Sequence, residues 1–292
     1  MVSKPLPFVK MQAVGNDFVV VEEGEWPEET NWAEQSLRLC DRHFGIGGDG
    51  LLVVAPSEAA DARMRMFNPD GTEDMCGNGL RCVALLAHQR GMLQDSGTIE
   101  TIVGVRLISI DTLVSPAEVV AEMGVPLFAP QDLPAIVPAD RKNVLDYPLT
   151  VEGCGEFQVS TVNTGSTHTV LWVDELPDDS LFFMASRGIE THPLFPERTS
   201  VLWAKVLSNG RSGQAPLLQI RIWERGAGET LGCGTGACAV AALALAQGKV
   251  IGDSVAVRSK GGVLRISARG IGSPLQMTGT AEIVYIGVVP VP

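Results

Sequence analysis

Two cysteines open two similar glycine-rich segments of this chain, Cys76–Gly79 (Cys-Gly-Asn-Gly) and Cys233–Gly236 (Cys-Gly-Thr-Gly). Each segment leads into an Ala/Leu-rich stretch that ends, at the same distance from its cysteine, in a glycine, Gly91 or Gly248. This spacing predicts a helix that begins at the cysteine and is capped by the glycine. A thiol at a helix N-terminus faces unpaired backbone N–H groups, which lower its pKa toward the thiolate. Two copies of this arrangement indicate two acid/base groups that act on one substrate.

Length, composition and charge exclude several classes of protein. The chain has 292 residues, of which 45% are hydrophobic and 19% charged, so it can bury a large core and is not disordered. This length fits two domains. The net charge of −12 argues against nucleic acid or an anionic membrane surface as a partner. We therefore expect a small-molecule substrate.

The sequence predicts a cytoplasmic protein. Residues 1–7 lack the apolar core of a signal peptide. The longest strongly apolar run, residues 237–246, is too short to span a bilayer and is typical of a buried helix. Without an export signal, the cysteines are expected to be reduced thiols.

The other cysteines are given structural roles. The chain has six cysteines, at positions 40, 76, 82, 154, 233 and 238. A zinc site is the alternative use of the pairs 76/82 and 233/238, but their spacings differ from CxxC and no paired histidines lie nearby, so no metal is expected. Cys82 and Cys238 lie inside the predicted helices, where free cysteine commonly packs as a small hydrophobe.

The chain is internally duplicated. Segment 15–20 resembles segment 165–170, and segment 67–71 corresponds loosely to 223–227, in the same order as the two cysteine motifs. Two copies are too few for a repeat array. They predict a pair of pseudo-symmetric domains with a ligand cleft between them.

Domain boundaries follow from the duplication. A proline-rich stretch at 126–138 is the predicted crossover. We place the N-terminal domain at residues 1–126, with the C-terminal strand 279–292 returning to it, and the C-terminal domain at residues 127–278.

Short β-branched runs separated by Gly, Pro and Asp predict many strands and few helices, which is the α+β class. Besides the two cysteine helices, a helix is expected after Asn31, whose side chain can cap it, with Glu34 at the third position. The expected strands are 18–21, 51–55, 98–103, 119–123, 158–162, 169–173, 217–223, 255–258, 263–267 and 281–286.

These motifs together resemble the diaminopimelate epimerase family, in the family's order and from about residue 8 to the last strand. The segments that carry the resemblance are Gly15–Phe18, Phe67–Glu73, Cys76–Cys82, Trp223–Thr230 and Cys233–Cys238. The resemblance implies an isomerase without a cofactor, in lysine and peptidoglycan-precursor synthesis, that interconverts LL- and meso-diaminopimelate. It also implies a homodimer in which each chain has two domains, each a curved, mostly antiparallel sheet around a central helix, with the active site in the cleft.

The resemblance assigns roles to individual residues. One of Cys76 and Cys233 removes the α-proton as thiolate, and the other returns a proton to the opposite face as thiol. His168 and Glu224 influence the cysteine pKa values. The implied substrate-binding residues are Asn16, Asn68, Gly77, Asn78, Ser166, Ser200, Glu224, Arg225, Gly234 and Thr235.

Three departures from the family pattern concern substrate recognition. Ser166 and Thr167 stand where the family usually has Asn and Pro, Ser200 stands where it usually has Asn, and Gly50 replaces a glutamine of some members. A hydroxyl offers fewer hydrogen bonds than an amide, and each one lost costs roughly 1–3 kcal/mol. None of these departures changes Cys76 or Cys233, the implied proton-transfer pair.

Three alternatives stay open. A related racemase with the same chemistry would act on another α-amino acid. An isomerase of the phenazine-biosynthesis type would lack the paired cysteines, which this chain keeps. A non-catalytic paralogue would bind a ligand without exchanging its α-proton.

Overall fold

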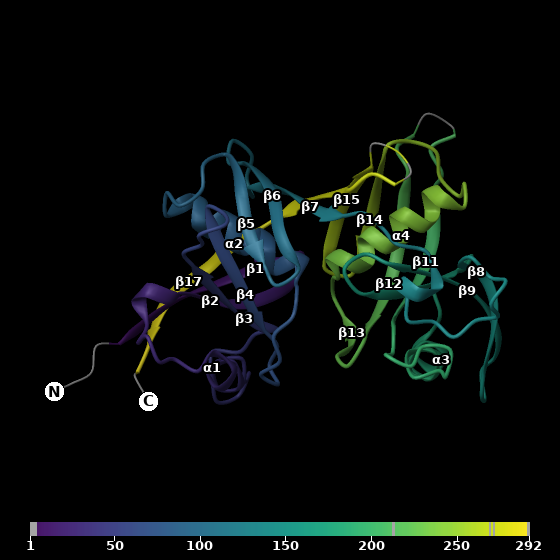
Figure 1. The fold of residues 1–292 in the computed structure, drawn as a ribbon, viewed down its shortest axis with the longest axis horizontal. Helices are drawn as coiled ribbons and strands as arrows, with labels where there is room; N and C mark the ends of the chain where they lie inside the picture. Colours follow the sequence, from purple (N-terminus) through teal and green to yellow (C-terminus); the bar gives the residue numbers. More distant parts are fainter. Residues whose placement is uncertain (1–4, 212–213, 269, 271, 291–292) are drawn as a thin grey trace. The chain divides into compact units, whose positions relative to one another are not determined.

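The computed structural model describes residues 5–211, 214–268, 270 and 272–290. The chain divides into two compact units, Met1–Glu122 with Thr278–Pro292, and Met123–Met277. The sequence placed these divisions after residues 126 and 278. Figure 1 shows the elements of both units.

The first unit is one mixed sheet with two α-helices (Figure 1). Its strands run in the order β17-β1-β2-β3-β4-β5-β6-β7; only the pairs β2/β3 and β4/β5 are parallel. The strands are β1 (Leu6–Ala13), β2 (Asn16–Glu22), β3 (Gly50–Ala55), β4 (Ala62–Phe67), β5 (Ser96–Thr101), β6 (Gly104–Asp111), β7 (Glu118–Gly124) and β17 (Glu282–Val289). The helices are the 3-10 turn η1 (Glu23–Glu25), α1 (Trp32–Leu39) and α2 (Gly77–Gln89).

The second unit repeats the order and the parallel or antiparallel pairing of the strands from β17 to β6 of the first. Its strands run β8-β9-β10-β11-β12-β14-β15, with only β10/β11 and β12/β14 parallel, and β13 also pairs with β12. The strands are β8 (Val144–Val151), β9 (Gly155–Asn163), β10 (Thr167–Trp172), β11 (Ser200–Ser208), β12 (Leu217–Glu224), β13 (Gly228–Thr230), β14 (Ser254–Ser259) and β15 (Gly262–Ala268). Strand β16 (Leu275–Thr280) begins in this unit and ends in the first. The helices are the 3-10 turn η2 (Pro130–Asp132), α3 (Asp179–Glu190) and α4 (Gly234–Ala246).

The two units repeat one topology down to single contacts. Phe18 pairs with Gly50 across β2/β3, and His168 pairs with Ser200 across β10/β11. Arg65 of β4 donates two hydrogen bonds to Glu73, and Arg221 of β12 likewise donates two to Glu229. The predicted duplication and α+β class are therefore confirmed.

Each unit is organised around the helix that a cysteine opens. Helix α2 packs against β1, β2, β3, β4 and β6, and α4 packs against β9, β10, β11, β14 and β15. Residues Gly77–Ala87 of α2 are all buried, and α4 is apolar on every side. A helix that is apolar all round belongs in a core. None of the described helices is long and apolar enough to cross a membrane.

The predicted helix ends are present. The Asn31 side chain accepts a hydrogen bond from Glu34 N at 3.3 Å, which caps α1. Gly91 and Gly248 follow α2 and α4 with φ of +73° and +64°, the left-handed conformation that ends helices. Helix α3 was not predicted; it begins at Asp178, whose side chain accepts from Leu181 N at 2.9 Å.

Replacing the cap of α3 should destabilise the second unit. Asp178→Ala removes the acceptor of Leu181 N, so the free energy of unfolding should fall by about 1 kcal/mol. Chemical denaturation measures the change. Asp178→Asn keeps an acceptor and serves as the control, and equal stability of the two variants would contradict the capping role.

Candidate active site

Cys76 is the N-cap of α2. Its backbone is extended, with φ −134° and ψ 115°, and its Sγ accepts a hydrogen bond from Gly79 N at 3.3 Å. A Cβ on Gly79 would lie 2.7 Å from Leu52 Cδ2, so the glycine lets the first turn lie this close to β3 without displacing the buried Leu52 side chain. The thiol is half-buried.

Cys233 repeats this geometry at the start of α4. Its φ and ψ are −132° and 116°, and its Sγ accepts from Gly236 N at 3.3 Å. A Cβ on Gly236 would lie 2.8 Å from Leu202 Cδ2. The helix starts and their cysteine caps are thus built in the same way in both units, as the sequence predicted.

The environment of Cys233 favours the protonated thiol. Burial raises its pKa well above the usual value, and the nearby Glu224 carboxylate raises it further. The Thr235 hydroxyl and the Gly236 N–H lower it, but by less. The first-turn N–H thus lowers the pKa of Cys233 as expected, but the expected net shift toward the thiolate is wrong, because loss of water and a like charge outweigh the helix start.

Three amide and carboxylate side chains join Cys76 in one network. Asn16 Nδ2 donates to Asp49 Oδ2 at 2.5 Å, which turns Asn16 Oδ1 toward Asn78 Nδ2 at 3.1 Å and Cys76 Sγ at 3.9 Å. Asn78 Oδ1 accepts from Arg81 at 2.8 Å. The predicted residues Asn16, Asn78 and Cys76 thus lie together. Asp49 was missed, although it directly precedes Gly50, one of the three departures from the family pattern.

Asn68 is used within its own turn. Its Nδ2 donates to Thr72 Oγ1 at 3.0 Å, and Asp70 accepts from the Thr72 hydroxyl and backbone N–H. Asp70 is therefore a turn former. The side-chain hydrogen bond of Asn68 thus stays within this turn.

His168 is buried and neutral. Its Nε2 lies 3.1 Å from Ser166 Oγ, and its Nδ1 has no hydrogen-bond partner among the described residues. Burial and then the charge of Arg225 lower its pKa to about 3. A neutral imidazole adds no charge near Cys233, so the charged neighbour that shifts the Cys233 pKa is Glu224.

Ser200 supports the turn that carries Arg225. Its side chain is buried, and its Oγ accepts from Arg225 N at 3.1 Å. The Arg225 guanidinium donates to Glu197 O at 3.1 Å, and the Thr230 hydroxyl donates to the Glu224 carboxylate. The second unit therefore brings Ser200, Arg225 and Glu224 into one turn region.

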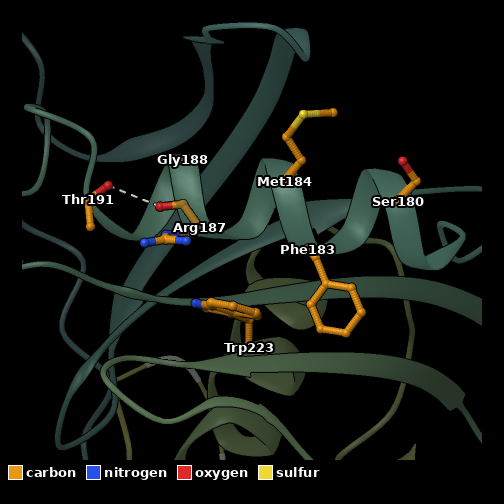
Figure 2. A pocket seen from close by; sticks show the side chains of 7 residues that line it. All are labelled: Ser180, Phe183, Met184, Arg187, Gly188, Thr191 and Trp223. Carbon is orange, nitrogen blue, oxygen red and sulfur yellow. Dashed lines mark hydrogen bonds between the residues drawn. The ribbon is translucent and has the colours of Figure 1, made fainter.

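A pocket of about 650 Å³ lies elsewhere on the second unit, between α3 and Trp223 (Figure 2). It contains no predicted site residue. Its lining residues are Ser180, Phe183, Met184, Arg187, Gly188, Thr191 and Trp223. Figure 2 shows the Trp223 ring lying against the last turns of α3.

The comparisons with known proteins agree with these motifs. The sequence model described as diaminopimelate epimerase matches residues 8–128 and 160–284. The chain belongs to the diaminopimelate epimerase family. The expected resemblance, and with it an isomerase of the epimerase type, is confirmed.

Relatives and solved structures extend this result. Proteins named diaminopimelate epimerase from Desulfovibrio desulfuricans and Desulforudis audaxviator are 38% and 40% identical, and each alignment covers 97% of this chain and 97% or 98% of the relative. A hydroxyproline epimerase from Agrobacterium vitis has a TM-score of 0.71 at 16% identity, covering 100% of this chain and 95% of that one. A Bacillus anthracis protein of the PhzF family has a TM-score of 0.69 at 18% identity, covering 99% of this chain and 100% of that one. These two structures support the fold alone.

Removing the charge of Glu224 should lower the pKa of Cys233. Glu224→Gln deletes the carboxylate that raises this pKa, so the thiolate should appear at lower pH. The midpoint of the pH titration of Cys233 is measured by the ultraviolet absorbance of its thiolate. The blank is the Glu224→Gln protein that also carries Cys233→Ala.

Glu197→Gln is the matched control, because Glu197 is exposed and bonds Arg225 only through its backbone carbonyl. The control should leave the Cys233 midpoint unchanged. An unchanged midpoint in Glu224→Gln would show that Glu224 does not act on the thiol.

Proposed function

We propose that this protein is a diaminopimelate epimerase that interconverts the LL and meso forms of 2,6-diaminopimelate without a cofactor. The observation that carries the proposal is the matched pair of cysteine N-caps, each with Sγ 3.3 Å from a glycine N–H, in a chain of this family. We further propose a cytoplasmic homodimer in lysine and peptidoglycan-precursor synthesis.

The proposed chemistry is a transfer of protons at the α-carbon by two sulfurs. A thiolate on one face removes the α-proton, which leaves a carbanion, and a thiol on the other face returns a proton with inverted configuration. The raised pKa of Cys233 supports its entering as the thiol, and Cys76 is then the first base. The roles exchange when the reaction runs backward.

The proposal also assigns a task to the helix starts. An α-proton beside a carboxylate is a weak acid, because the carbanion adds a second negative charge. The first-turn N–H groups of a helix have no acceptor inside the helix. Those of Gly77 and Asn78, and of Gly234 and Thr235, are positioned after the two cysteines to hold the carboxylate and stabilise the developing charge.

The distal end of the substrate is assigned to the turn after β12. A guanidinium suits bidentate capture of a carboxylate, so Arg225 would hold the distal carboxylate and Glu224 the distal amine. Asn16, Asn68, Ser166 and Ser200 are the remaining proposed contacts. We propose the domains 1–126 with 279–292, and 127–278, as the two parts that supply one thiol each.

A second candidate is a racemase of another α-amino acid. Two observations favour it: the Ser166 hydroxyl lies 3.1 Å from His168 Nε2, and the Ser200 hydroxyl accepts from Arg225 N. Both hydroxyls, which stand where the family has amides, already have a partner within the protein. Recognition of the distal end therefore has fewer groups than in the family pattern.

A substrate panel in heavy water tests the proposed function. Diaminopimelate should be epimerised faster than lysine, glutamate or histidine. Solvent deuterium should enter the product before it enters remaining substrate, because the returning proton comes from the opposite thiol. Equal or faster turnover of lysine would favour the second candidate, and α-proton exchange with none of the four would indicate a binding paralogue.

Removal of either thiol should stop the reaction. Cys76→Ala and Cys233→Ala should each lower the epimerisation rate by a hundredfold to about ten-thousandfold, since each deletes one acid/base group. Circular dichroism should show an intact fold. Cys154→Ala is the control, because this half-buried cysteine lies outside both helix starts, and it should keep wild-type activity. Full activity in either of the first two variants would refute the pair.

A further inference from the structure

Glu190, the last residue of α3, is a buried carboxylate with a full set of donors. Its side chain is 4% exposed. Oε1 pairs with the Arg198 guanidinium and accepts from Gly226 N at 2.8 Å. Oε2 accepts from Trp223 Nε1 at 2.7 Å. One carboxylate therefore connects α3, the loop before β11 and the turn after β12.

The two residues of the β12 turn that donate hydrogen bonds to Glu190 flank a dipeptide. Trp223 and Gly226 are the residues directly before and after Glu224 and Arg225. The turn closes with Ala227 N bonded to Glu224 O at 3.1 Å, and Gly226 has a φ of +80°, a conformation suited to glycine. Glu190 therefore fixes both ends of the segment that carries the two charged side chains.

Stability alone is a poor reason for this carboxylate. Burying a charge is costly, and buried ion pairs can often be replaced by apolar residues without loss of stability. What an apolar residue cannot provide is two acceptor oxygens, one aimed at the Gly226 backbone N–H and the other at the Trp223 indole N–H. The equivalent turn after β4 is held differently, by Asp70 within the turn itself.

We propose that Glu190 is a positioning residue that sets where Glu224 and Arg225 meet the distal end of the substrate. The inference rests on the proposed function and adds a residue outside the predicted site. Glu190 acts through the β12 turn: a loosened turn weakens capture of the distal carboxylate by Arg225, and it moves Glu224 relative to Cys233.

Two substitutions of Glu190 separate the effect of its side-chain length from the effect of its charge. Glu190→Gln keeps the length but offers one oxygen, so its NH₂ group must oppose either the Trp223 or the Gly226 donor. Glu190→Asp keeps the charge for Arg198 but withdraws the oxygens from the turn. Both should raise the KM for diaminopimelate by about tenfold or more, as loss of a hydrogen bond to a charged group implies. A kcat that falls less than KM rises marks a positioning role.

A double variant tests the hydrogen-bond geometry. Trp223→Phe removes the indole donor, so in Glu190→Gln/Trp223→Phe the glutamine oxygen can turn to Gly226 N while its NH₂ group meets no donor. The double variant should therefore bind substrate better than Glu190→Gln alone. If the losses of substrate affinity in the two single variants simply add in the double variant, this hydrogen-bond geometry is contradicted.

Glu175→Gln is the matched control. Glu175 also pairs with a cation, Lys205, but its side chain is 85% exposed and bonds neither end of the β12 turn. This control should keep the wild-type KM and kcat. A Glu190→Gln variant that melts at lower temperature yet keeps wild-type KM and kcat would show a purely structural role and overturn the inference.

Amide hydrogen exchange makes the test independent of the substrate. The Gly226 amide should exchange about tenfold faster in Glu190→Asp than in wild type, because the shorter side chain withdraws its acceptor oxygen from the turn. Unchanged exchange would overturn the inference even in a protein with no epimerase activity. Inactive wild type with faster Gly226 exchange in the variant would instead defeat the proposed function and leave the positioning of the turn supported.

Discussion

The bond from a glycine N–H to a cysteine sulfur at each helix start fixes the rest of the site. This hydrogen bond depends on three features of the chain. They are a cysteine with extended backbone, a glycine three residues later, and a strand leucine packed directly against that glycine. Leu52 and Leu202 supply the last condition, because a Cβ on Gly79 or Gly236 would lie 2.7 Å or 2.8 Å from the leucine Cδ2 and would require that buried side chain to shift. The sulfur position is therefore set by the packing of a buried helix on its sheet, which is stiffer than a loop.

The duplicated backbone carries side chains that differ, and the difference matters more than the symmetry. Cys76 is half-buried beside the amides of Asn16 and Asn78, whereas Cys233 is buried beside the Glu224 carboxylate. A reaction with two proton-transfer groups needs one of them charged and the other neutral at the same moment. Equal surroundings would give equal thiols. Unequal side chains on equal backbones allow one thiol to stay protonated.

The sequence predicted those parts of the fold that local signals encode. Helices α2 and α4 were found because a cysteine start and a glycine stop frame an apolar run, and α1 because Asn31 caps it. Helix α3 was missed, although Asp178 is a good cap and Phe182, Ala185 and Ile189 face the core. Its register was hidden because exposed Phe183 and Met184 interrupt the pattern of buried residues.

Several strands were missed, and not always for lack of a local signal. Strand β4 reads Ala-Arg-Met-Arg-Met-Phe, whose alternation of apolar and charged residues is typical of a half-buried strand. Glu190 and Asp49 were missed for a different reason, because their partners lie far along the chain. Long-range polar contacts leave no local pattern, whereas the cysteine motifs do.

In the proposed mechanism, recognition of the distal end of the substrate depends on the residues that hold the β12 turn in place. Ser166 and Ser200 are partnered by His168 and by Arg225 N, so in the proposed mechanism the main distal contacts are the charged side chains of Glu224 and Arg225. A charged pair selects a ligand only as sharply as its own position is fixed, because displacement of a few tenths of an ångström changes bidentate capture. Under the proposed function, selectivity for the distal end therefore depends less on the number of substrate contacts and more on the rigidity of the turn after β12, which we infer that Glu190 at the end of α3 provides.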